Sequence, residues 1–252
     1  MILTGTGMIR TISAPVSPVV QCFTANGTWS CCTGAVCIEV VAVAGGGGGG
    51  GGVQALGTWG GGGGGGAGGV VICTLTSGFG TSQCVIRGAG GAGGQGFCFG
   101  FNTAGSPGGN SCFGSLVIAT GGGGGGAAST SNGTAAGGIG GNGSPNGGNG
   151  GASADSTNGG SATGKPGGGG ASISRTFVPT IPGAGSTICG ITLGAGGTGS
   201  ENNYPNLNTT ANGSIYGGGG GGAQNDQQNP ASNVGNGRTG AAGIIKVTQY
   251  FS

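Results

Sequence analysis

The chain has 252 residues, of which 76 are glycine, and its six Lys and Arg and four Asp and Glu give a formal net charge of +2. So few and dispersed basic residues argue against a nucleic-acid-binding surface, which needs clustered Lys and Arg. Low charge and apolar residues gathered in short stretches also argue against a disordered chain, which usually carries many charges. The length suits one folded domain, with or without a short arm.

The segment 1–19 comes first and contains two short apolar stretches, Met1–Leu3 and Met8–Ile9. It has neither the basic start nor the long apolar core of a secretory signal, so we expect no signal peptide. We predict that this segment is either an arm that docks on another protein or a first β-strand. The glycine-rich domain itself is expected at 20–252.

Short stretches rich in Val, Ile, Thr and aromatic residues are bounded by Gly, Asn and Ser, which is the pattern of β-strands. No window favours an α-helix, because good helix formers are scarce and glycine would break any helix they began. Trp29 belongs to the first strand pair and is expected in the core. The predicted strands are Val19–Phe23, Val36–Val43, Val70–Leu75, Cys84–Arg87, Leu116–Thr120, Thr187–Leu193 and Ile244–Tyr250.

Uninterrupted glycine runs lie between these strands. Each ordered glycine costs roughly 0.5–1 kcal/mol relative to alanine, so the runs are favourable only where bare backbones must touch. The left-handed polyglycine II-type helix suits them, because it has three residues per turn, rises ~3.1 Å per residue and directs its N–H and C=O groups to neighbouring chains. The runs are Gly45–Gly52, Gly60–Gly66, Gly121–Gly126, Gly167–Gly170 and Gly217–Gly222.

The predicted fold class is therefore all-β and irregular, with short β-strands combined with a bundle of polyglycine II-type helices and no α-helix of note. Three polar segments are expected to be exposed loops that join the helices, since they are rich in Ser, Asn, Thr and Gln. These segments are Ala127–Lys165, Gly199–Gly213 and Ala223–Gly237.

Nine cysteines occur without any histidine and without a CxxC pair, so neither the spacing nor the residue types favour a metal site. Most of them neighbour valine or isoleucine, which favours small buried apolar side chains. Disulfides stay open as an alternative, because they can form in an oxidising medium. An odd number leaves at least one thiol unpaired in a monomer.

The sequence offers no catalytic arrangement. Its four carboxylates include no neighbouring pair, and the absence of histidine excludes Ser-His-Asp and Cys-His nucleophile systems. Strings of the form GxGxxG arise by chance in so glycine-rich a chain, and no helix or later acidic residue completes a dinucleotide site. We therefore predict that the protein is not an enzyme and has no cofactor and no bound metal.

Exposed aromatic residues beside Asn, Ser and Gly make effective recognition loops. Alternatives exist for several candidates, since Trp59 could cap a rod end and the phenylalanines could pack locally or between subunits. Phe97, Phe99 and Phe101 alternate and are expected on one side of an extended chain. The candidate binding residues are Trp59, Phe99, Phe101, Tyr204 and Asn206.

Six sequence elements follow one another along the chain: Cys22–Trp29, Ile38–Val43, Arg87–Gly94, Ser111–Gly121, Tyr216-Gly217 and Gly240–Val247. Their order resembles the order of elements in the glycine-rich domain found in bacteriophage tail proteins. The resemblance covers about residues 20–250, and more loosely the chain is similar to polyglycine-helix adhesins at tail-fibre tips. The chain departs from the family at the turn 30–35, where a V-P-A-G-like sequence is usual.

This resemblance implies a phage virion protein, either a receptor-binding protein or a fibre-tip adhesin, which presents loops on a rigid scaffold. Its implied partners are a bacterial surface receptor, either an outer-membrane protein or a glycan, and other virion proteins that contact the N-terminal arm. A homotrimer is conceivable, and the implied location is the virion. Two alternatives stay open: a structural virion component such as a fibre shaft or capsid-surface protein, and a non-viral glycine-rich extracellular protein.

Overall fold

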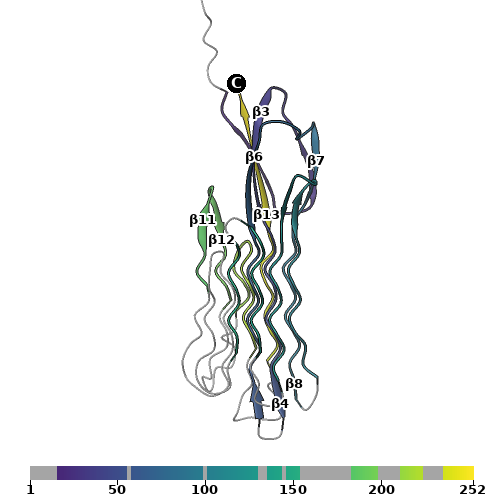
Figure 1. Cartoon of the computed structure of the whole chain (residues 1–252), viewed down its shortest axis with the longest axis vertical. Helices are drawn as coiled ribbons and strands as arrows, with labels where there is room; N and C mark the ends of the chain where they lie inside the picture. Colours follow the sequence, from purple (N-terminus) through teal and green to yellow (C-terminus); the bar gives the residue numbers. More distant parts are fainter. Residues whose placement is uncertain are drawn as a thin grey trace, which may run out of the picture.

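The structure is a computed structural model of the chain. It has a β-sandwich at one end, a set of extended glycine-rich segments that run side by side along the long axis, and a small sheet at the opposite end (Figure 1). We call these the sandwich end, the rods and the distal end. The residues that the structure describes are 16–55, 58–98, 101–129, 135–143, 146–153, 183–197, 211–223 and 235–252.

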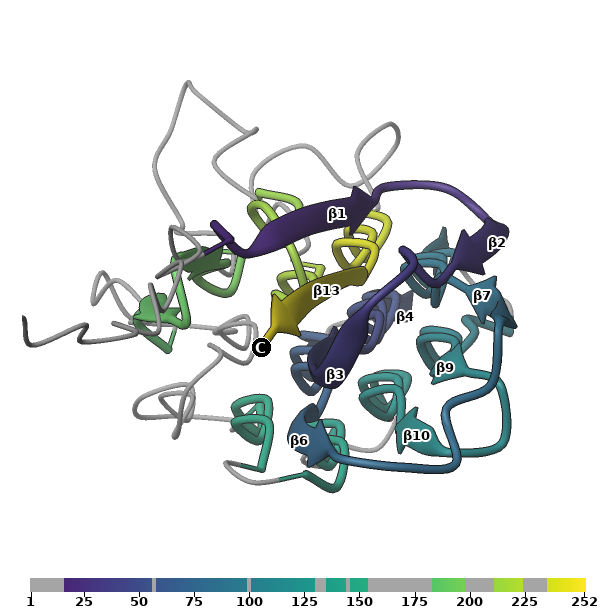
Figure 2. The same ribbon diagram turned by 90° about the horizontal axis from the view of Figure 1, so that it is seen from above.

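The first sheet of the sandwich contains β1 (Val19–Phe23), β13 (Ile244–Phe251), β3 (Ala35–Val43) and β6 (Val70–Leu75), in that order and all antiparallel. The strand nearest the N-terminus thus pairs with the strand nearest the C-terminus (Figure 2). Alternate residues of β13 face the two sides of this sheet, as a period of two requires.

The second sheet contains β10 (Val117–Ala119), β9 (Ser111–Phe113), β7 (Ser82–Ile86) and β2 (Gly27–Ser30), also antiparallel. Its strands are short, and each ends where a glycine-rich segment or a turn begins. One face packs against the first sheet, and the other carries exposed side chains such as Ile86 and Ile118.

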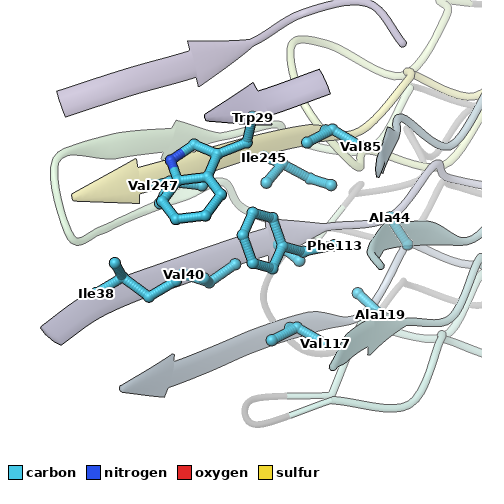
Figure 3. Close-up of a cluster of buried hydrophobic side chains, with 11 residues drawn as sticks. Trp29, Ile38, Val40, Ala44, Val85, Phe113, Val117, Ala119, Ile245 and Val247 are labelled. Carbon is cyan, nitrogen blue, oxygen red and sulfur yellow. The ribbon is translucent and has the colours of Figure 1, made fainter. Parts of the chain in front are cut away.

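The core between the two sheets is centred on Trp29, which is fully buried (Figure 3). Its ring makes edge contacts with Phe113 at a centroid distance of 5.3 Å and with Phe79 at 6.2 Å. This confirms the prediction that Trp29 is a core residue. The buried members of this cluster are Trp29, Ile38, Val40, Ala42, Ala44, Val85, Phe113, Val117, Ala119, Ile245 and Val247.

A hairpin of β11 (Ser186–Ile188) and β12 (Ile191–Leu193) covers part of the outer face of the first sheet, where Ile191 and Leu193 pack against Val41 and Val43. The sequence predicted one strand over Thr187–Leu193, and this was wrong. Cys189 and Gly190 have φ angles of 47° and 73°, so the chain reverses there through a two-residue turn.

Most other strand predictions are confirmed. The bounds of β1 and β6 agree with the prediction, and β3, β7, β10 and β13 differ from it by one or two residues at an end. β4, β5, β8 and β9 were not predicted, and β2 was indicated only through the assignment of Trp29 to a strand pair. Each has only two to four residues, and alternation is not visible over so short a length. Within the described ranges the structure contains no α-helix.

At the distal end lies a three-stranded sheet of β5 (Thr58–Gly60), β4 (Val53–Ala55) and β8 (Phe97–Cys98). β4 pairs antiparallel with β5 and parallel with β8. Each of these strands adjoins the distal end of one rod. Three rods therefore end in a hydrogen-bonded sheet rather than in unpaired backbone.

The central rod, residues 44–52, has a complete set of backbone hydrogen bonds. All nine of its N–H groups donate to other rods at 2.8–3.2 Å, and the carbonyls of residues 45–52 all accept at 2.8–3.2 Å. The partners repeat every three residues: Gly45, Gly48 and Gly51 donate to Gly109, Ser106 and Thr103 of one neighbour. This is the period expected for a segment with three residues per turn; the left-handed sense of the rods stays a prediction.

Six rods surround the central rod, three accepting its N–H groups and three donating to its carbonyls. Figure 2 shows these segments from above as compact coils packed side by side. A buried backbone without such partners would lose about 1–3 kcal/mol per unpaired group, so the neighbours replace a conventional apolar core. The six neighbours lie in the ranges 60–69, 88–97, 101–110, 120–129, 217–223 and 235–243.

Burial distinguishes the inner rods from the outer ones. Every residue of 44–52, 60–69 and 217–223 is buried. Among the outer rods, 120–129 has only buried and half-buried residues, most positions of 101–110 are exposed, and 88–96 and 135–143 expose every third position. The exposed positions in 88–96 and 135–143 are Ala89, Ala92, Gln95, Ala136, Ile139 and Asn142.

Two outer rods, 135–143 and 146–153, fall within the segment predicted to be an exposed loop, Ala127–Lys165, so that prediction was wrong for these residues. Glycine occupies most positions at which these rods touch a neighbour, and at their distal ends the contact is made by buried Ala135 and Ser153. Similarly, 211–213 and 235–237 form backbone hydrogen bonds with other rods. The rest of the three predicted loop segments lies mostly outside the described residues, as does the run Gly167–Gly170.

Asn and Thr side chains complete the hydrogen bonding at the perimeter of the bundle. Asn149 Oδ1 accepts from the Gly140 N–H at 2.8 Å, and Asn146 Oδ1 accepts from the Gly143 N–H at 2.9 Å. Asn110 does the same for Gly121 at 3.0 Å. These side chains take the place of a further rod, which explains why Asn recurs in the outer rods.

Ser111 joins a rod to the sandwich, and its loss should be costly. Its buried Oγ accepts from the Gly88 N–H at 2.9 Å and donates to the Val43 carbonyl at 2.7 Å. Ser111→Ala removes the partner of the Gly88 N–H and one hydrogen bond to the Val43 carbonyl, so we expect a loss of about 1–3 kcal/mol in the free energy of unfolding, measured by urea denaturation.

Ser106→Ala is the matched control for this prediction. Ser106 is exposed on an outer rod and takes part in the rod hydrogen bonds through its backbone alone. Its substitution should change the free energy of unfolding by less than about 0.5 kcal/mol. Equal effects of the two substitutions would contradict the role given to Ser111.

Candidate functional site

The candidate site is at the distal end, where the small sheet fixes the ends of the rods. Val53 of β4 is buried and lies opposite Gly60 of β5 and beside Phe97 of β8. The Phe97 N–H donates to the Gly52 carbonyl at 3.2 Å, continuing the three-residue series of rod hydrogen bonds. The small sheet is therefore an extension of the rods.

Two hydrogen bonds clamp the outer rods together next to this sheet. The Thr103 N–H donates to the Gln95 carbonyl at 3.0 Å, and the Gln95 N–H donates to Thr103 Oγ1 at 2.8 Å. The next residue after Gln95 is also held, because the Gly96 N–H donates to Asn236 Oδ1 at 2.9 Å. Hydrogen bonds therefore fix the backbone of Gln95, Gly96 and Thr103.

Asn102 anchors the start of the rod that contains the clamp. Its side-chain Nδ2 donates to the carbonyls of Gly51 at 3.0 Å and Ala128 at 2.8 Å. One amide therefore ties three rods together at their distal ends. Residue 101 immediately precedes this anchor, so its backbone is attached to a fixed point.

Two phenylalanines at the distal end are exposed on this fixed backbone. Phe101 is 94% exposed and Phe97 is 48% exposed. Phe97 follows Gln95 by two residues and Phe101 precedes Thr103 by two, so the two clamp residues flank the aromatic residues in sequence. An exposed aromatic ring on an ordered backbone is a typical feature of a recognition surface.

The distal end carries no charge among the described residues. The charged side chains of the described ranges are Glu39, Arg87, Arg238 and Lys246. Glu39 and Lys246 lie on the first sheet of the sandwich, and Arg87 directly follows β7. Arg238 lies one turn of its rod away from Gly235, the residue that bonds to Gly52 at the distal end.

Charge effects are concentrated at the sandwich end. Lys246 Nζ donates to the Cys189 carbonyl at 2.6 Å and so holds the β11–β12 turn over the first sheet. Partial burial raises the pKa of Tyr250 above its ordinary value, and nearby Glu39, Cys37 and Cys189 add to the rise. None of these groups faces the distal end.

The predicted site residues have different outcomes. Phe101 is exposed at the distal end. The backbone of Trp59 lies on β5 opposite Gln54, in the same sheet; its side chain lies outside the described part, as do Phe99, Tyr204 and Asn206 as whole residues. The residues that anchor Phe101, namely Asn102 and Thr103, were not identified from the sequence, because their partners are distant along the chain.

Eight cysteines are described, and all are free thiols without full burial. Cys22, Cys84 and Cys189 are exposed, and the others are half-buried. The expectation of buried apolar cysteines was therefore wrong for the three exposed thiols. It holds in part for Cys31 and Cys73, which are partly buried and pack against the core.

Neither a metal site nor a membrane-spanning helix occurs within the described ranges. None of these residues forms a group of three or more His, Cys, Asp or Glu side chains that could hold a metal ion. Nor does any helix there have the length and apolar character needed to cross a membrane.

Comparison with known proteins gives one informative result. A family model described as a glycine-rich domain matches residues 23–250. The matched range runs from the last residue of β1 to the penultimate residue of β13, and it includes all the rods. A search of curated proteins gives no match.

Proposed function

The chain belongs to the glycine-rich domain family, and from that premise we propose that it is a bacteriophage virion protein that attaches the particle to its host. In this proposal the rods form a stiff scaffold, the distal end contacts a bacterial surface receptor and the sandwich end faces the rest of the particle. The support for phage attachment is the resemblance to tail-fibre tip proteins, combined with the following properties of the distal end.

The observation that carries the proposal is the exposed aromatic side chain on an anchored backbone. Phe101 is 94% exposed, yet the adjacent Asn102 makes two hydrogen bonds to other rods. Such a side chain contributes nothing to the fold's own core, while its fixed position reduces the entropy lost on binding a partner. A recognition role accounts for both features.

The scaffold supports the same role. The rods are held by backbone hydrogen bonds between main-chain groups, and outer rods such as 88–96 and 135–143 expose every third residue. Residues at the exposed positions and at the rod ends can therefore change without loss of the interior contacts. This property suits a surface protein whose recognition residues vary.

Residues 1–19 are proposed as the arm that docks on another virion protein, and the receptor is an outer-membrane protein or a glycan. Residues 1–15 lie outside the described part, and Val19 begins β1 at the sandwich end. A homotrimer would give several copies of the distal end, and avidity would then strengthen weak single contacts.

A second candidate function is a structural virion component without its own receptor. The observation that favours it is the set of exposed apolar side chains on the outer faces of the sandwich, including Val20, Ile72, Ile86 and Ile118. Ile86 and Ile118 lie on β7 and β10 of one sheet, and exposed apolar residues gathered on one face are typical of surfaces that contact other proteins. In this alternative the sandwich end, not the distal end, makes the functional contacts.

Two measurements test the attachment proposal together. Mass spectrometry of purified phage particles from cultures that carry the gene should detect the chain, and the labelled full chain should bind saturably to at least one strain in a panel of bacterial isolates. Absence from particles contradicts both virion functions. Presence in particles without binding to any strain favours the structural component.

A further inference from the structure

We propose that the Phe101 ring inserts into an apolar pocket of a receptor protein on the bacterial surface, an inference that rests on the attachment function proposed above. Phe101 is the most exposed large apolar side chain among the described residues, at 94%. Phe97, on β8 at the same end, is 48% exposed.

The backbone that carries the Phe101 ring is preorganised for binding. Asn102 Nδ2 binds the carbonyls of Gly51 and Ala128, and the next residue, Thr103, forms the two-bond clamp with Gln95. This backbone is therefore tied to three rods. A ring held in this way loses little backbone freedom when it docks, which is the condition for an effective binding anchor.

The shape of the exposed area favours a concave partner. A ring that is 94% exposed presents both faces and its edge to solvent. A sugar or a flat membrane surface would cover mainly one face, whereas a pocket covers both faces and the edge. Because the apolar contribution grows with the area removed from water, a concave protein site gains more from this side chain than a flat surface does.

The described residues of the distal end favour a neutral contact, because they contain no Lys, Arg, Asp or Glu. Attraction to an anionic membrane or to phosphorylated saccharides depends on clustered basic residues. The described part of this end, with its projecting aromatic ring, is complementary to a neutral apolar cavity, and binding through this ring should depend weakly on salt.

The test uses the full chain, fluorescently labelled, titrated onto a strain from the isolate panel that binds it. Phe101→Ala should weaken binding by at least about thirtyfold, the loss expected for an aromatic anchor. Changing NaCl from about 0.05 M to about 0.5 M should alter the affinity of the unsubstituted chain less than about threefold. Protease treatment of the cells should abolish binding, and periodate oxidation of their glycans should not.

Ile139→Ala is the matched control, because Ile139 is 76% exposed on the side of an outer rod. It should change affinity less than about twofold, since it lies outside the proposed contact. Both variants should melt at the temperature of the unsubstituted chain. Unchanged binding of Phe101→Ala, or binding that periodate removes and protease does not, overturns the pocket while leaving attachment in place; a chain that binds no strain overturns both.

Discussion

Gly48→Ala is expected to remove more than about 4 kcal/mol of folding free energy, which is exceptional for a single methyl group. Gly48 lies in the middle of the central rod, donates to Ser106 at 2.9 Å and accepts from Gly125 at 2.8 Å. An added Cβ would overlap the carbonyl of Ala92. No flexible side chain is available to move away, so whole rods must separate and lose their hydrogen bonds.

The effect should be measured by urea denaturation with tryptophan fluorescence and by hydrogen exchange of the amides in residues 44–52. Total stabilities of domains are about 5–15 kcal/mol, so this loss could unfold the chain at ambient temperature. In that case the exchange protection of residues 44–52 disappears altogether. A loss below about 1 kcal/mol would show that the rods are not packed as closely as described.

Gly27→Ala is the control, because it makes the same chemical change at an open position. A Cβ on Gly27 would lie 3.6 Å from Phe23 Cδ1, which is an ordinary contact. The substitution also reduces the freedom of the unfolded chain in the same way as Gly48→Ala, and that effect alone is stabilising by about 0.4–1 kcal/mol. The difference between the two variants therefore isolates the close approach of the rods.

Trp29→Ala is expected to cost about 3–5 kcal/mol, the usual range for removing a large buried aromatic side chain. Trp29 is fully buried and contacts the rings of Phe79 and Phe113. It lies on β2, which pairs with only one other strand, so its side chain supplies much of the attachment of that strand. Differential scanning calorimetry measures the loss without relying on the removed fluorophore.

Two further variants sharpen this prediction. Trp29→Phe keeps a ring in the core and removes an indole N–H that has no hydrogen-bond partner, so it should cost less than about half as much as Trp29→Ala. Phe101→Ala removes an exposed aromatic ring and should change stability by less than about 0.5 kcal/mol. Similar losses for Trp29→Ala and Phe101→Ala would contradict the assignment of Trp29 to the core.

The candidate site was predictable only in part. Phe101 could be singled out from the sequence because an aromatic residue in a glycine-rich polar context has few apolar neighbours to pack against. Its anchoring could not be predicted, because the partners of Asn102 are the backbone carbonyls of Gly51 and Ala128, which lie 51 and 26 residues away. Every residue has a backbone carbonyl, so the sequence does not show which carbonyl will accept a given hydrogen bond.

The cysteines show a second limit of prediction from the sequence, namely which side chains are buried. Valine and isoleucine around Cys73 and Cys84 correctly indicated strands, but the sequence did not show which face of each strand would be covered. Cys73 packs against the core, whereas Cys84 is exposed. Apolar neighbours along the strand therefore did not imply burial.

The sequence by itself determined the element types: Val- and Ile-rich stretches had to form strands, and long glycine runs had to lie where no side chain fits. A Cβ in the middle of the central rod would overlap a neighbouring backbone, which is why only glycine fits there. Only the tertiary structure decided which rods are neighbours and that Phe101 stands at the distal end. Rods bind one another through identical backbone groups, so partner choice is not encoded locally and depends on where the sandwich fixes the start of each rod.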